Sequence, residues 1–420
     1  MANTLKFGNG NWATKEGSTL AYNDQNGNFK PLPFDFSRAS KATVVNKDGL
    51  IEEVGSGQPR IDYKDDSKGA LLLEPSRSNI LPYSNKFINT GWQYYRGTII
   101  ANATISPDGT LNASRYQEDS QTGKHLFRRQ SLSIINGLSY TGSIFAKKGE
   151  LTSIDLQSNS SSRWVASASF DLENGVVISG TGVIEDYGNG WYRCSISGNA
   201  VQTTPDAGLE IYTSVGIGRD GDGLFMYGAM FEQSSFPTSY IPTNGGTVTR
   251  SAETANGSGD ASTFNDSEGV FMAEISIPKN STEVKQLSLN NGNTNEAVKI
   301  VQLSDGTTFR FEVNMSSGSN FREDIIVNPY ETNKLALQYK ANEYKVFING
   351  IKQTVVQRSN LPIGLNTISF NRGIASTDDF YGKTKQIQYY NSALTDSELE
   401  TLTSWVSFQD MAEGQLYTIE

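Results

Sequence analysis

The chain has 420 residues, with 35 Lys and Arg against 45 Asp and Glu, so its net charge is 35 − 45 = −10. This acidic balance, without a long basic run, argues against binding to a nucleic-acid backbone. A single Cys (Cys194) and a single His (His125) exclude an intrachain disulfide, a multi-Cys metal centre and a paired-His metal site.

Hydrophobic residues make up 36% of the chain and aromatic residues 10%, and there are 40 glycines. Such a polar, Gly-rich and aromatic composition favours many short strands joined by turns, and it disfavours disorder. No stretch approaches the roughly 18 apolar residues of a membrane span, and residues 1–10 lack the pattern of a signal peptide. We therefore expect a soluble all-β protein made in a reducing cytoplasm, with no membrane insertion and no cofactor.

The first segment, residues 1–84, is interrupted at short intervals by glycines such as Gly8, Gly10 and Gly17. Short extended pieces remain between them, but helical periodicity is absent. The segment is predicted to bury no core of its own. We interpret it as an extended arm for attachment or assembly.

Residues 85–250 alternate apolar and polar positions over short segments bounded by turn residues, which is typical of strands. The best strand candidates are residues 139–146, 166–172, 191–197 and 224–232. Strands at this spacing predict an antiparallel jelly roll or β-sandwich. Residues 251–267 are polar and are predicted to be a linker.

The alternating pattern restarts in residues 268–420, which are predicted to form a second sandwich. Its strand candidates are residues 270–277, 335–339, 344–348, 366–370 and 385–390. One short helix is predicted near the C-terminus, because Thr395 and Glu398 have the spacing of a capping box. That helix is expected to bury Leu399, Leu402 and Val406.

Most catalytic motifs are absent, because the residues that they need do not occur at the required spacing. The Glu-x-Asp-x-x-Glu pattern of sandwich-fold glucanases is missing, since no Glu is followed two positions later by Asp. His125, in the basic and strand-like stretch 123–133, is interpreted as a surface or hydrogen-bonded structural residue. Cys194 is expected to be a buried, inert thiol. We predict no enzyme and no metal site.

Aromatic residues offer the one binding chemistry that the sequence suggests. Trp92, Tyr94 and Tyr95 cluster after a turn-like stretch, and Trp164 stands between Ser-rich segments. Such rings stack on the apolar faces of sugars. The alternative is that they fill a core or a subunit interface, and the number of aromatic residues that a thin core needs favours this alternative.

Residues 34–79 contain FDFSRAS, DGLIEEVGSGQPRIDY and GALLLEPSRSNIL in that order. This ordered set resembles a segment found repeatedly in bacteriophage tail-fibre and head-fibre proteins. Residues 105–113, 184–198 and 225–243 resemble the carbohydrate-binding-module-like jelly roll of such proteins. Residues 385–402 resemble a concanavalin A-like or laminin-G-like lectin domain.

The opening residues 5–23 resemble the start of structural proteins from crAss-like and related podoviruses. The resemblance implies a virion protein, a homotrimer attached to the particle through residues 1–84, with outward domains that bind bacterial surface glycans. It favours a head fibre or decoration protein over a tail fibre receptor-binding protein. A glycan depolymerase and a purely structural cementing protein stay open as alternatives.

Overall fold

The computed structural model describes residues 4–88, 91–281, 283–318, 320–373 and 378–418. They form two compact units, and each is described by itself. Unit 1 takes its residues from 1–39, 55–75 and 252–420, and unit 2 from 40–54 and 76–251. The chain therefore passes between the units four times. Neither of the two helices in the described residues is long or apolar enough to cross a bilayer.

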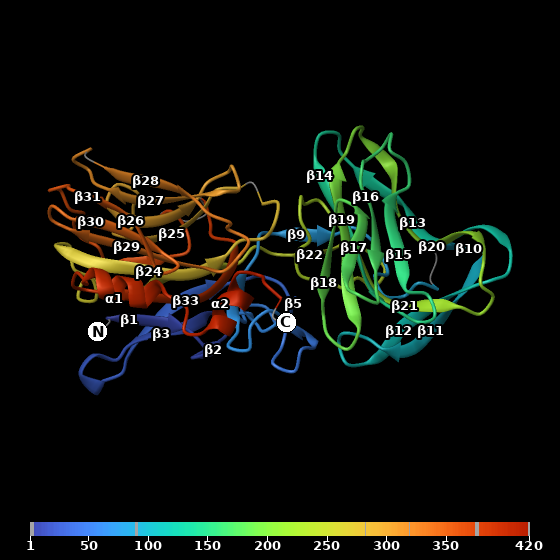
Figure 1. Ribbon diagram of the computed structural model, residues 1–420, viewed down its shortest axis with the longest axis horizontal. Coiled ribbons are helices and arrows are strands. Elements are labelled where there is room, and N and C mark those ends of the chain that lie inside the picture. Colours follow the sequence, from blue (N-terminus) through green and yellow to red (C-terminus); the bar gives the residue numbers. More distant parts are fainter. Residues whose placement is uncertain (1–3, 89–90, 282, 319, 374–377, 419–420) are drawn as a thin grey trace. The chain divides into compact units, whose positions relative to one another are not determined.

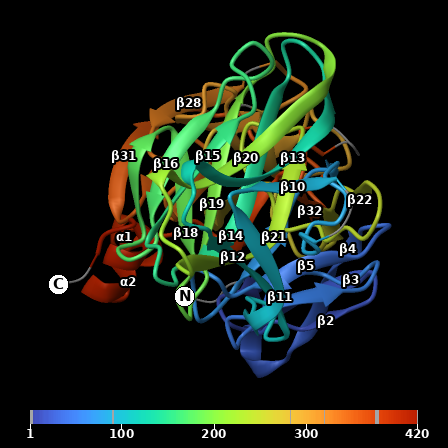
Figure 2. The same ribbon diagram turned by 90° about the vertical axis from the view of Figure 1, so that its right-hand side faces the viewer.

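Unit 2 contains two six-stranded antiparallel sheets (Figure 1). One has the strand order β10-β13-β20-β15-β16-β17, whose middle strands lie side by side in Figure 2, and the other has the order β11-β12-β21-β14-β19-β18. The strands of unit 2 are β5 (Ala42–Val45), β6 (Ile51–Val54), β9 (Arg77–Asn79), β10 (Trp92–Tyr95), β11 (Gly97–Ile105), β12 (Leu111–Glu118), β13 (Thr122–Ile134), β14 (Ser139–Lys147), β15 (Ser153–Ser158), β16 (Ser167–Asp171), β17 (Val176–Gly180), β18 (Gly182–Asp186), β19 (Trp191–Asn199), β20 (Thr204–Ile217), β21 (Gly223–Glu232) and β22 (Val248–Arg250). The four strands predicted from alternation in this part of the sequence are confirmed as β14, β16, β19 and β21.

Apolar side chains from the two sheets form the core of unit 2, because alternate residues of each strand point to the same face. Phe127, Leu209 and Ile211 belong to this core, as does the fully buried Cys194. The prediction of a buried thiol is therefore confirmed, and burial raises the pKa of Cys194 far above its ordinary value.

Unit 1 contains a continuous antiparallel pairing that runs β28-β27-β26-β25-β32-β23-β4-β3-β1-β33-β24-β29-β30-β31. Its strands are β1 (Leu5–Gly8), β2 (Thr14–Lys15), β3 (Ser18–Asn23), β4 (Lys30–Ser37), β7 (Ile61–Asp62), β8 (Ala70–Leu73), β23 (Thr254–Ser258), β24 (Glu268–Ser276), β25 (Lys285–Asn290), β26 (Ala297–Gln302), β27 (Thr308–Asn314), β28 (Phe321–Ile326), β29 (Asn333–Lys340), β30 (Tyr344–Ile348), β31 (Ile351–Val356), β32 (Thr367–Ser369) and β33 (Gly382–Tyr390). The five strands predicted for this part are confirmed as β24, β29, β30, β32 and β33. The all-β prediction with antiparallel sandwiches is thus confirmed.

The predicted helix is confirmed as α1 (Asp396–Thr403), and a second helix, α2 (Phe408–Gly414), follows it. Thr395 accepts a hydrogen bond from the backbone N of Glu398, whose carboxylate accepts one from the backbone N of Thr395, so the capping box is present. Leu399 is fully buried. The prediction for Val406 is wrong: the helix ends at Thr403, and Val406 is 77% exposed.

Residues 1–84 do not form a separate arm, which corrects the predicted domain boundaries. Strand β1 pairs with β33, so that Leu5 lies opposite Tyr389, and β4 pairs with β23. The apolar residues of these glycine-interrupted strands, Phe7 and Phe34 among them, are buried in the same core as the C-terminal strands. The predicted linker 251–267 is likewise wrong in part, since β23 is a sheet strand.

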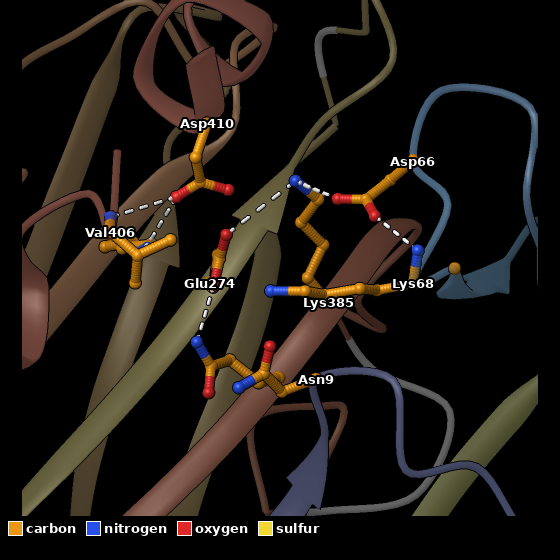
Figure 3. Close-up of a pocket in the computed structure, with 10 residues that line it drawn as sticks. Asn9, Asp66, Lys68, Glu274, Lys385, Val406 and Asp410 are labelled. Atoms are coloured by element: carbon orange, nitrogen blue, oxygen red, sulfur yellow. Dashed lines mark hydrogen bonds and ion pairs between the residues drawn. The ribbon is translucent and has the colours of Figure 1, made fainter. Parts of the chain in front are cut away.

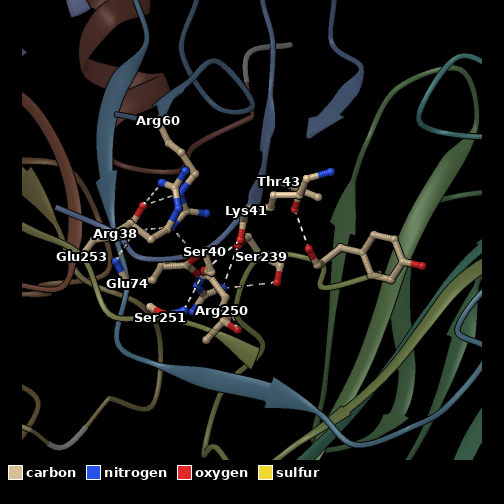
Figure 4. A network of polar contacts seen from close by, with 12 residues as sticks. Arg38, Ser40, Lys41, Thr43, Arg60, Glu74, Ser239, Arg250, Ser251 and Glu253 are labelled. Carbon is tan, nitrogen blue, oxygen red and sulfur yellow. Dashed lines mark hydrogen bonds and ion pairs between the residues drawn. The ribbon is translucent and has the colours of Figure 1, made fainter. Parts of the chain in front are cut away.

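A buried ion cluster lies in unit 1 where the chain leaves and re-enters that unit (Figure 4). Arg38 Nη1 donates to Glu253 Oε1 at 2.7 Å and Nη2 donates to the carbonyl of Gly55 at 2.5 Å. Arg60 Nε donates to Glu253 Oε1 at 2.8 Å, and its Nη2 donates to Glu74 Oε2 at 2.8 Å. Arg38, Gly55, Glu74 and Glu253 stand within two residues of the four passages, so one cluster holds all four together.

Unit 2 has its own contacts at the same passages. The backbone N of Ser251 donates to Ser40 Oγ at 2.9 Å, and Arg250 Nη1 donates to Ser239 Oγ at 2.9 Å (Figure 4). Strands β9 and β22 pair antiparallel, and so do β5 and β6. Each unit therefore holds its own four chain ends in place.

Candidate functional site

A row of polar side chains crosses the outer face of the sheet that contains β13 and β20 in unit 2. The strand register places Gln93 of β10 opposite Arg128 of β13, Arg128 opposite Glu210 of β20, and Glu210 opposite Gln157 of β15. The neighbouring Phe127 and Ile211 point into the core, so the row lies on the opposite face of the sheet. Four strands thus contribute one side chain each to a single polar row.

Arg128 is the centre of this row. Its Nε donates to Gln93 Oε1 at 3.0 Å, its Nη1 to Glu210 Oε1 at 2.9 Å, and its Nη2 to the hydroxyl of Tyr95 at 2.7 Å. The guanidinium carbon lies 4.7 Å from the centre of the Tyr95 ring. These contacts hold both Arg128 and Tyr95 in one conformation, which lowers the entropy that a ligand has to remove.

A second tyrosine extends the polar row. The Tyr212 hydroxyl donates to Glu210 Oε2 at 2.7 Å, and Lys124 Nζ donates to the Tyr212 hydroxyl at 3.3 Å. Burial raises the pKa of Tyr212, and its hydrogen bond to Glu210 raises it further. The phenol is therefore a neutral donor to Glu210. We call the set Gln93, Tyr95, Lys124, Arg128, Gln157, Glu210 and Tyr212 the outer-face cluster.

The structure separates the four aromatic residues that the sequence singled out. Trp164 is fully buried, its ring lies edge-on to Phe231 with centres 5.1 Å apart, and its Nε1 donates to the carbonyl of Gly208 at 3.1 Å. Trp92 is also in the core. Trp92 and Trp164 therefore fill the core, which is the alternative that the sequence favoured, and their candidate role in sugar binding is wrong because neither ring has an open face for a sugar.

Tyr94 and Tyr95 are exposed, at 48% and 43%. They point to opposite sides of β10, since Tyr94 lies opposite the core residue Phe127 whereas Tyr95 contacts Arg128. Only Tyr95 joins the outer-face cluster. The sequence analysis did not single out Arg128, Glu210 and Tyr212, because strands far apart in the chain bring them together and no local pattern gives the register of those strands.

His125 was predicted to be a surface residue or a hydrogen-bonded structural residue, and the structure shows neither. Its side chain is fully buried, and neither ring nitrogen has a hydrogen-bond partner among the described residues. Its Nε2 lies 3.5 Å from Asp119 Oδ1. The adjacent Glu118 accepts hydrogen bonds from Thr213 Oγ1 at 2.7 Å and from Ser214 Oγ at 2.6 Å. Within the described ranges, no group of three or more His, Cys, Asp and Glu side chains is placed to hold a metal ion.

A small pocket in unit 1 is filled by its own ion pairs (Figure 3). Lys385 Nζ lies 2.5 Å from Asp66 Oδ2 and 3.8 Å from Glu274 Oε1, and Gln386 Nε2 donates to Glu274 Oε2 at 2.6 Å. The volume is about 60 Å³, which admits only a few water molecules. The ion pairs of this pocket join the N-terminal segment of unit 1 to its C-terminal strands. The pocket is too small for a sugar.

The fold and side chains define an all-β protein of two units with an ordered polar and aromatic cluster on one outer sheet face. No family model matches the chain, and no curated protein matches it. Among solved structures, the CBM40 of the Ruminococcus gnavus IT-sialidase is 18% identical over 36% of this chain and 94% of that chain, with a TM-score of 0.30.

Two further solved structures cover more of the chain. Domains LG4-5 of the mouse laminin alpha1 chain are 10% identical over 64% of this chain and 86% of that chain, with a TM-score of 0.24. The Trypanosoma rangeli sialidase in complex with 2,3-difluorosialic acid is 11% identical over 96% and 82%, with a TM-score of 0.29. Likenesses of this strength are too weak to assign a function.

Proposed function

We propose that this protein binds glycans without catalysis, through the outer-face cluster of unit 2. The single observation that supports this is the position of Tyr95 beside Arg128: the ring is exposed, and three hydrogen bonds and one ring contact hold the guanidinium in place. An exposed aromatic ring packs on the C–H face of a sugar, and fixed polar groups beside it bind the hydroxyls.

The rest of the cluster fits hydroxyl groups. Gln93 and Gln157 both donate and accept, and Glu210 accepts from Arg128, Gln157 and Tyr212. Amides and a carboxylate on one sheet face match vicinal sugar hydroxyls, which also both donate and accept. Tyr95 and Gln93 are exposed whereas Glu210 and Tyr212 are buried, so a ligand would contact the exposed end of the cluster. Weak binding at each copy is therefore expected, with avidity of roughly 10²–10⁴ when sites are linked.

Glycan-array binding of the full chain tests this proposal. Tyr95→Ala is expected to lower binding at least tenfold, and Arg128→Met is expected to do the same. Tyr94→Ala is the matched control, because Tyr94 is equally exposed on the same strand and points to the other side. Equal losses for Tyr94→Ala and Tyr95→Ala, or binding to no glycan, would sink the proposal.

We propose further that the protein is a structural component of a bacteriophage virion, of the head-fibre or decoration type, acting as a homotrimer. The support is the resemblance of residues 34–79 and 5–23 to such proteins. Arg38, Arg60 and Glu74 of the resembling segments meet in the buried cluster of unit 1, which gives those segments a structural role. Attachment to other virion proteins through residues 1–84, and assembly in the host cytoplasm, are part of this proposal.

Immunogold labelling of intact phage with antibody against residues 268–420 tests the location. Gold over the head is expected. Gold at the tail would instead favour a tail fibre receptor-binding protein, and absence from the particle would refute the virion assignment. Light scattering of the purified chain tests the trimer, for which a monomer at micromolar concentration would be the contrary result.

A further inference from the structure

A polar hollow lies over the sheet formed by β25, β26, β27 and β28 in unit 1. The register places Ser288 opposite Lys299, Lys299 opposite Glu312, and Glu312 opposite Arg322, so these four side chains share one face. The hollow has a volume of about 360 Å³. That is within the range of small-ligand sites.

The charges in this hollow favour an anion. Three cationic side chains, Lys299, Arg322 and Arg372, line it together with two carboxylates, Glu312 and Asp378, which gives 3 − 2 = +1. The whole chain carries −10. A local positive balance on an acidic protein is unusual enough to attract a negatively charged ligand to this one place.

These charges are incompletely paired within the described residues. Arg322 Nη2 lies 3.3 Å from Glu312 Oε1, and Arg372 Nη1 lies 3.4 Å from Asp378 Oδ2. On the same two strands β27 and β28, outside the hollow, Arg310 binds Asp324 with two hydrogen bonds of 2.7 and 2.8 Å. The guanidinium groups that line the hollow therefore have longer contacts than their neighbour, which leaves donors for a ligand.

Lys299 gives the strongest indication that the hollow binds an anion. It is only 4% exposed, and the one hydrogen bond of its Nζ to a described residue is a 3.4 Å contact to the carbonyl of Thr294. Burial lowers the pKa of Lys299, while Glu312 raises it and Arg372 lowers it. A buried ammonium with one long hydrogen bond is costly, and a carboxylate beside it would remove much of that cost.

Side-chain amides supply the neutral part of the lining. Gln286, Asn295, Asn314 and Asn320 reach the hollow, and the buried Oδ1 of Asn314 has no hydrogen-bond partner among the described residues. Met315 is the one apolar residue of the described lining. Amides that both donate and accept suit a ring of hydroxyls, and they suit a purely apolar ligand poorly.

We propose that this hollow binds an acidic saccharide. Its carboxylate lies against Lys299 with Arg372 or Arg322, and its hydroxyls bind the amides. The site is in unit 1, uses none of the outer-face cluster, and does not depend on the function proposed for unit 2. This site would give the protein a preference for sugar acids, although the net negative charge of the whole chain repels them.

Calorimetric titration of the full chain tests the proposal. The probes are oligosaccharides that contain glucuronate, galacturonate or sialic acid, each compared with its carboxyl-reduced counterpart. At least one acid is expected to bind tenfold or more tightly than its reduced form, and to lose affinity as NaCl is raised. Lys299→Met is expected to weaken that binding at least tenfold, and Arg372→Gln, on a half-exposed side chain, keeps the test valid if Lys299→Met fails to fold.

Two control variants make the outcome specific. Arg310→Gln removes an arginine of β27 that does not line the hollow, and it is expected to leave binding unchanged. Tyr95→Ala in unit 2 is expected to do the same. Equal affinity for acids and their reduced forms, or binding to no acid, would overturn the proposal. Inorganic phosphate that binds as tightly as the saccharide would also overturn it, because the hollow would then recognise an anion and not a sugar.

Discussion

Arg60 and Glu253 form a fully buried ion pair although 193 residues separate them in the chain. Arg60 Nε donates to Glu253 Oε1 at 2.8 Å, and Arg60 Nη2 donates to Glu253 Oε2. Burial opposes the charge of Arg60, but Glu253 and Glu74 outweigh it and raise the pKa of Arg60. The pair joins two segments of unit 1, residues 55–75 and residues 252–420, close to the points where the chain enters that unit.

Removing the charge of Glu253 is expected to destabilise unit 1 severely. In Glu253→Gln, Arg38 and Arg60 keep their charges in a buried site but lose the carboxylate that both of them contact. Breaking such a pair costs about 3–5 kcal/mol. Urea unfolding at pH 7 measures this loss.

The matched control is Glu53→Gln in the exposed pair of Lys41 and Glu53, whose contact is just as short at 2.6 Å. Water and salt screen an exposed pair, so this variant should unfold like the wild type. Similar losses in both variants would mean that burial does not govern the stability of the cluster.

Truncation of the buried Trp164 should lower the stability of the protein without removing a direct contact to a glycan. Trp164→Ala empties a fully buried position against Phe231, and large-to-small changes of this kind cost about 3–5 kcal/mol. Tyr95→Ala, on an exposed ring, should cost less than about 1 kcal/mol. Thermal unfolding of both variants checks this, and a stable Trp164→Ala protein that loses glycan binding would contradict the structure.

Acid should weaken unit 2 partly through Glu118. Burial raises the pKa of Glu118, but hydrogen bonds from Ser214, Thr213 and the backbone N of Arg219 together lower it below the ordinary 4.5. A carboxyl group with a lowered pKa in the folded state stabilises that state above pH 4.5, and the contribution is lost as the pH falls through the folded pKa.

Glu118→Gln is therefore expected to be less stable than the wild type at pH 7, with a difference that shrinks below pH 4.5. Urea titrations at pH 7, 5, 4 and 3 follow that difference. Glu173→Gln, in the exposed pair with Lys148, serves as the comparison. A difference independent of pH would assign the effect of Glu118 to packing alone.

The capping box of α1 gives a small and specific prediction. Thr395→Ala removes the acceptor for the backbone N of Glu398, which should cost about 1 kcal/mol. Thr401→Ala, at an exposed position inside the same helix, should be neutral or slightly stabilising because Ala is the better helix former. Equal changes in stability in the two variants would show that the capping box does not stabilise α1.

Much of the local structure could be predicted from the sequence, because it depends on neighbours along the chain. Alternation with period two located β14, β19, β24 and β30, since the two faces of each strand meet different surroundings. The capping box located α1 for the same reason. The buried thiol of Cys194 followed from its place in an alternating strand.

The amino-acid sequence thus determined the all-β class, nine of the strands and the helix α1, all of which follow from propensities and spacing within a few residues. Only the tertiary structure decided that β1 pairs with β33 and that Arg60 meets Glu253, because such pairings join segments that no local pattern connects. It also decided which tyrosine faces Arg128, since the register of β10 against β13 places Tyr95, and not Tyr94, on the same face as Arg128. The candidate sites depend on cross-strand registers, and a register is fixed by the packing of whole sheets.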